Sequence, residues 1–79
     1  MTILTKADKL QMLNSHIRSL EYSKYGLQLD LMQENAKQNT NSEEVSRIQA
    51  LIADTDNQLE ALDEELTTVN ALKIGRAHV

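Results

Sequence analysis

The chain has 79 residues, a formal net charge of −4, no cysteine, no proline and two glycines. A chain of this size makes one domain at most, and the lack of cysteine excludes disulfides and thiolate metal sites. Because the chain is acidic and lacks a basic stripe, neither nucleic acid nor a membrane surface is expected as a partner. With so little proline and glycine to interrupt them, long helices are favoured over a sheet with many turns.

The first predicted element is a helix from about residue 6 to residue 37. Residues 1–9 contain no apolar run long enough for a signal peptide or a membrane span, so we expect a cytoplasmic protein. Thr5 is the predicted N-cap, and Asp8, three residues later, completes a capping box. Beyond this cap, mostly apolar residues recur at alternating spacings of three and four, as in a coiled coil. These positions form the first seam: Leu10, Leu13, Ile17, Leu20, Lys24, Leu27, Leu31 and Glu34.

Residues 38–42, with the sequence Gln-Asn-Thr-Asn-Ser, form the one polar, turn-forming run of the chain. Asn and Ser side chains bond to nearby backbone, so they end one helix and cap the next. Thr40, Asn41 and Ser42 are all candidate N-caps for the second helix. Because the connection is short, two long helices would lie antiparallel. The alternative is one continuous helix, since nothing in the run forbids helix outright.

The second predicted helix, residues 43–73, carries a three–four pattern sustained over four heptads. Its positions form the second seam: Val45, Ile48, Ile52, Thr55, Leu59, Leu62, Leu66 and Val69. Paired from the turn outward, the two seams meet in eight layers, from Glu34 with Val45 to Leu10 with Val69. The predicted fold class is therefore all-α, an antiparallel two-helix coiled-coil hairpin that oligomerises into a larger helical bundle.

One internal layer of this pairing is polar, because Lys24 falls opposite Thr55. A polar seam residue costs stability while fixing the register, so we interpret this polar layer as a specificity device. The aliphatic stem of the lysine would cover the seam while its ammonium reaches water near Glu21 and Asp56.

The last six residues, 74–79, break the heptad pattern and match the translation of ATC GGA AGA GCA CAC GTC, a short-read sequencing adapter. We therefore expect this segment to be a non-native tail and exclude it from fold reasoning.

A second three–four pattern on the first helix contains both aromatic residues of the chain. A two-helix hairpin buries only one face of each helix, so this second pattern would be left in water. Scattered surface hydrophobes are normal, but four at contact spacing favour an interface. We call this set the aromatic stripe: Tyr22, Tyr25, Leu29 and Met32.

The chain offers little that resembles a catalytic, cofactor or metal site. The Asp54-Thr55-Asp56 run lacks the glycine that a calcium loop requires, because Leu59 occupies that position. His16 is the one histidine outside the tail, and no second ligand stands at metal spacing from it; it is expected to flank the seam and meet Glu65. No nucleophile–base pair or phosphate loop is present, so we expect neither an enzyme nor a cofactor nor a small-molecule substrate.

These observations favour a small structural, assembly or adaptor protein that acts through coiled-coil contacts with its own copies or with a partner helix. The alternative is a regulatory binding module, antitoxin-like or chaperone-like, that captures another chain. In its general build, as a short proline-free helical hairpin, the chain resembles small uncharacterised proteins encoded by tailed phages. That resemblance implies a phage-encoded protein.

Overall fold

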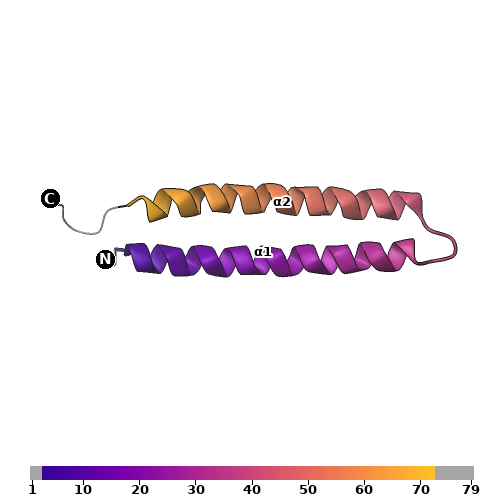
Figure 1. The fold of residues 1–79 in the computed structure, drawn as a ribbon, viewed down its shortest axis with the longest axis horizontal. Coiled ribbons are helices and arrows are strands. Elements are labelled where there is room, and N and C mark those ends of the chain that lie inside the picture. Colours follow the sequence, from indigo (N-terminus) through magenta and orange to yellow (C-terminus); the bar gives the residue numbers. More distant parts are fainter. Residues whose placement is uncertain (1–2, 73–79) are drawn as a thin grey trace.

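The computed structural model describes residues 3–72, so the predicted non-native tail at 74–79 lies outside the described residues. Two helices, α1 (Lys6–Asn35) and α2 (Ser42–Asn70), run antiparallel and side by side (Figure 1). Within the described range no strand is present. The predicted all-α hairpin is confirmed, and the alternative of one continuous helix is wrong. Whether it oligomerises stays a prediction.

The helix α1 begins with the predicted capping box. The Thr5 hydroxyl accepts a hydrogen bond from the Asp8 N–H, and the Asp8 carboxylate accepts one from the Thr5 N–H, each at 3.1 Å. Two backbone donors that helix geometry leaves without partners are thereby satisfied, and the Asp8 charge lies at the positive end of the helix. The start of α1 therefore follows from two residues of local sequence, Thr5 and Asp8.

At the closed end, where the turn joins the helices, Glu34 links both sides of the connection. Its Oε1 lies 2.9 Å from the Lys37 ammonium, and its Oε2 accepts the Asn41 N–H at 3.0 Å. Since Glu34 is only 6% exposed, its carboxylate needs these donors to offset the loss of water. The helix α1 ends at Asn35 rather than near residue 37, and the N–H of its C-cap, Ala36, donates to the Met32 carbonyl oxygen at 3.0 Å.

The N-cap of α2 is Asn41, one of the three candidates that the sequence left open. Its side-chain oxygen accepts hydrogen bonds from the N–H groups of Glu43 at 3.0 Å and Glu44 at 3.2 Å. The backbone N–H of the same Asn41 donates to Glu34, so one residue both caps α2 and ties it to α1. This double use fixes the direction in which α2 leaves the turn.

The helices pack along the two predicted seams. All sixteen seam positions are buried or half-buried, and Ile48 and Val69 are the most covered at 2% exposed each. Elsewhere in residues 3–72, comparable cover is found at only four polar positions, Lys6, Asp8, Lys9 and Glu44. The core is therefore a single strip between two helices, about 45 Å long for the 30 residues of α1.

Two long-range contacts agree with the predicted register. The Lys24 ammonium lies 2.7 Å from Asp56 Oδ1, next to the layer that pairs residues 24 and 55. At the open end, where the two terminal segments lie, the Lys6 ammonium donates to the carbonyl oxygens of Asn70 and Leu72 at 3.1 and 3.3 Å. A positive charge next to these carbonyl oxygens interacts favourably with the negative end of the α2 helix dipole. Lys6, in the first turn of α1, therefore caps the C-terminus of α2.

The closed end makes the fold sensitive to acid. The Lys37 ammonium, and after it the Asn41 N–H, hold the pKa of Glu34 below its ordinary value of 4.5. Because the folded pKa is depressed, the contribution of Glu34 to stability is complete above pH 4.5 and is lost as the pH falls through the folded pKa.

We therefore predict that Glu34→Gln lowers the free energy of unfolding at neutral pH. The difference from the wild type should shrink as the pH falls below 4.5, where the wild-type carboxylate itself becomes protonated. Urea unfolding followed by circular dichroism at a series of pH values measures this difference. Glu64→Gln, at an exposed position of α2, is the control and should show no such convergence. A gap for Glu34→Gln that stays constant down to pH 3 would contradict the assignment.

Candidate interaction surface

The aromatic stripe lies on α1 and is left uncovered by the hairpin. Its four side chains are exposed to the following extents: Tyr22 71%, Tyr25 59%, Leu29 39% and Met32 61%. None of them belongs to the first seam, which is where α2 covers most of α1. The structure therefore leaves in water a run of large apolar and aromatic side chains on the outer face of one helix.

Helix geometry brings these four residues together. Residues three and four apart are neighbours on a helix, so the spacings of three, four and three from Tyr22 to Met32 make one continuous row. Arg18, one turn before Tyr22, extends the row, with its guanidinium carbon 5.9 Å from the centre of the Tyr22 ring. Such a cation–π contact contributes about 0.5–1 kcal/mol at an exposed site, which helps to fix how the ring lies.

Near the stripe the neighbouring part of α2 is also uncharged. No charged residue occurs between Arg47 and Asp54, and in the observed register this segment passes beside Leu27 and Leu31. The segment includes one more exposed apolar side chain, Leu51, at 37%. Level with the stripe, the hairpin thus combines exposed apolar surface with a short uncharged stretch of α2.

The open half of the hairpin has a different character. Between Ile48 and Leu72, α2 and its end carry six carboxylates and no lysine or arginine. One of these carboxylates, Asp56, pairs with Lys24 of α1. The acidic segment is Asp54, Asp56, Glu60, Asp63, Glu64 and Glu65. The negative charge of α2 therefore increases towards the open end, with Asp54 and Asp56 level with the tyrosines of the stripe and the other four carboxylates beyond them.

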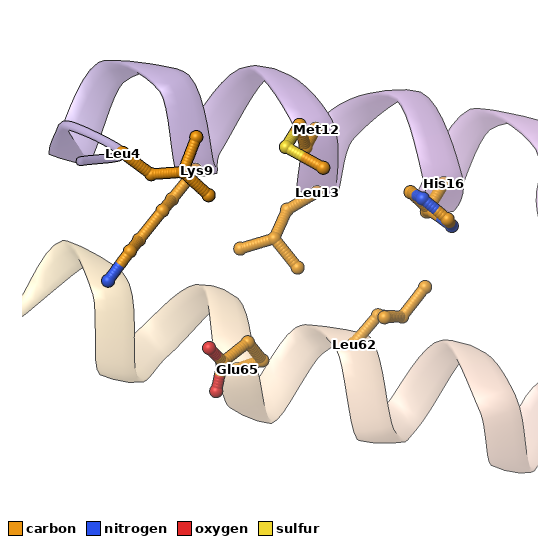
Figure 2. Close-up of a pocket in the computed structure, with 7 residues that line it drawn as sticks. All are labelled: Leu4, Lys9, Met12, Leu13, His16, Leu62 and Glu65. Carbon is orange, nitrogen blue, oxygen red and sulfur yellow. The ribbon is translucent and has the colours of Figure 1, made fainter. Parts of the chain in front are cut away.

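A groove between the helices at the open end was not foreseen from the sequence (Figure 2). The open-end groove is lined by both helices and by the segment before α1, with these residues: Leu4, Lys9, Met12, Leu13, His16, Leu62 and Glu65. Leu4 and Met12 are 48% and 51% exposed. Neither belongs to a seam or to the stripe, so the periodic patterns carried no signal for them.

His16 and Glu65, which were expected to meet across the helices, line this same groove from opposite sides. No hydrogen bond or ion pair joins these two described side chains. They flank the seam as predicted, but they contribute a polar rim to the groove rather than a direct contact.

The two residues of the polar layer satisfy their polar groups separately. Thr55 is 7% exposed, and its hydroxyl donates to the Leu51 carbonyl oxygen at 2.8 Å within α2. The Lys24 side chain, about one-third exposed, directs its ammonium to Asp56 at the surface. In this layer the buried side chain of Thr55 faces the aliphatic part of Lys24, and the charged ammonium of Lys24 lies at the surface.

Across residues 3–72, no three histidine or acidic side chains come close enough together to hold a metal ion. Neither α1 nor α2 contains a stretch apolar enough, over enough residues, to cross a membrane. Comparison with known proteins found no match among family models, curated proteins or solved structures. The surface features of the hairpin are therefore the observations on which a function must be argued.

The polar layer yields a prediction about Lys24→Leu. The lost surface ion pair is worth about 0–1 kcal/mol, whereas burying a leucine at a seam position contributes about 1.5–3 kcal/mol. The melting temperature should therefore rise. The molecules should also adopt more helix registers or oligomeric states, because no polar seam residue remains to disfavour the alternative pairings. Circular dichroism melts and light scattering after size exclusion measure the two effects.

Gln11→Leu is the matched control, because it adds a leucine at an exposed position of α1 outside the seam. It should leave the melting temperature nearly unchanged. A lower melting temperature for Lys24→Leu, with the oligomeric state unaltered, would count against the role assigned to the polar layer.

Proposed function

We propose that the protein is a small structural or assembly module that acts through helix–helix contacts made by the aromatic stripe. The observation that carries this proposal is the exposure of Tyr22, Tyr25, Leu29 and Met32 in one row on α1. The contacts are made with further copies of the chain. They require no cofactor, no metal and no small-molecule substrate.

The thin core of the hairpin favours association. Burial of one large apolar side chain contributes about 1.5–3 kcal/mol, and the hairpin alone obtains this for one strip of residues. Covering the stripe by a second surface would add several such contributions and stabilise the folded state by mass action. Tyrosine suits this role, because its ring is buried while its hydroxyl stays at a wet rim.

A second candidate function is a regulatory module that captures another chain, in the manner of an antitoxin or a chaperone. The open-end groove favours it, since its apolar floor of Met12, Leu13 and Leu62 is bordered by the charged Lys9 and Glu65. Such a partner would bind on a surface separate from the aromatic stripe, so the two functions respond to different substitutions.

We predict that Tyr25→Glu combined with Leu29→Glu abolishes assembly. Glutamate is a good helix former, so α1 itself should survive, but two charges in the stripe cannot be buried against another surface. At high protein concentration the molar mass should fall to that of one chain, and the melting temperature should drop by about 5 °C or more. Size exclusion with light scattering and circular dichroism melts measure both.

The control variant is Gln11→Glu combined with Ser15→Glu, which adds the same charge at exposed positions of α1 beyond the stripe. Its mass and melting temperature should match the wild type. If the Tyr25/Leu29 variant also keeps the wild-type mass and melting temperature, the stripe is ordinary surface. A wild-type chain that stays single but binds a partner equally well with and without the stripe would favour capture.

A further inference from the structure

We propose that the aromatic stripe docks onto the same stripe of a second copy, with the two α1 helices antiparallel and related by a two-fold axis that passes beside Gly26. This geometry rests on the proposed function as an assembly module. It produces a four-helix assembly in which the α1 helices form the centre and each α2 covers the far side of its own α1.

The spacing of the stripe is self-complementary under this symmetry. A two-fold axis at position 27 places Tyr22 opposite the second copy's Met32 and Tyr25 opposite its Leu29, and the exchanged pairs are identical. Each layer then sets an aromatic ring against a flexible or branched aliphatic side chain, and the methionine sulfur next to a ring adds a favourable contact. The stripe is therefore complementary to a second copy of itself that runs in the opposite direction.

Gly26 provides an independent observation at the same place. A glycine inside a helix costs about 1 kcal/mol relative to alanine, yet apart from its chain neighbours and the adjacent backbone of α1, no atom of the described hairpin lies within 4 Å of where its Cβ would be. The hairpin itself therefore gives no reason for a glycine there. Gly26 and Gln28 flank the stripe on either side of the proposed axis, where a residue without a side chain lets two backbones approach closely.

The charge distribution weakly favours the antiparallel arrangement over the parallel one. Four of the six carboxylates of the acidic segment of α2, from Glu60 to Glu65, lie towards the open end, whereas the stripe centres on residue 27 nearer the closed end. An antiparallel pair sends these carboxylates to opposite ends of the assembly. A parallel pair would place them at the same end, on the two outer helices, where their repulsion across the α1 helices would weakly oppose association at low salt.

The exposed area fits a second copy that binds weakly. A buried aromatic side chain contributes about 150–250 Å², so the exposed parts of Tyr22 and Tyr25, 71% and 59%, offer roughly 200–300 Å² per copy. Two copies, with Leu29, Met32 and the polar rim added, approach the ~1,000 Å² at which specific interfaces begin. We therefore expect a dimer that dissociates readily, with a dissociation constant on the order of micromolar or weaker.

Single-cysteine variants test this geometry directly, because the chain has no cysteine of its own. Gln28→Cys lies beside the proposed axis and Ser15→Cys lies far from it, and both positions are exposed on α1. In the antiparallel dimer the two copies of position 28 are offset by about 3 Å along the axis, and the two copies of position 15 by about 36 Å. A short bifunctional maleimide should therefore join two chains of Gln28→Cys and none of Ser15→Cys.

The other outcomes separate the geometry from the proposed function. Crosslinking at both positions would show a parallel pair, and crosslinking at position 15 alone would also overturn the geometry. No crosslink at either position, with a two-chain mass by light scattering, would overturn the geometry while assembly stands. A single-chain mass without any crosslink would overturn both. Adding Tyr25→Glu and Leu29→Glu to Gln28→Cys should abolish the crosslink, which excludes random collision as its source.

Discussion

Two helices packed together cover only one strip of each other, and this constraint governs the whole molecule. In residues 3–72 the most buried side chains all belong to the two seams, and most seam positions are only half-buried. Apolar residues elsewhere, such as Tyr22, Tyr25 and Met32, have no second layer of the same chain to pack against. A thin core and an uncovered row on α1 are therefore two consequences of one architecture, and association would relieve both.

Polar contacts close the strip at its two ends. At the closed end Glu34 joins Lys37 and the backbone of Asn41, and Asn41 in turn caps α2. At the open end Lys6 reaches the carbonyl oxygens of Asn70, the last residue of α2, and of Leu72 just beyond it. The Glu34–Asn41 contact spans the turn and the Lys6 contacts run from α1 to the end of α2, whereas the Asn41 cap is local to the start of α2. The apolar strip supplies attraction along its length, while these contacts decide where each helix starts and stops.

Much of this architecture could be predicted from the sequence, because the seam spacing and the Thr5–Asp8 capping box are properties of neighbouring residues in one chain segment. The choice of Asn41 as N-cap and the end of α1 at Asn35 could not, since Thr40, Asn41 and Ser42 are all chemically able caps and no glycine or proline marks where α1 stops. The aromatic stripe was visible as a second period on α1. The open-end groove was not, because Leu4, Met12 and Leu62 come together only after two helices have packed.

In the proposed assembly the hairpin completes its core by binding another copy through the aromatic stripe. Sedimentation equilibrium of the wild-type chain across concentrations from about 1 μM to about 1 mM measures this association. The molar mass should rise from one chain at the lowest concentrations towards two chains at the highest. A molar mass that stays at one chain over the whole range would contradict it.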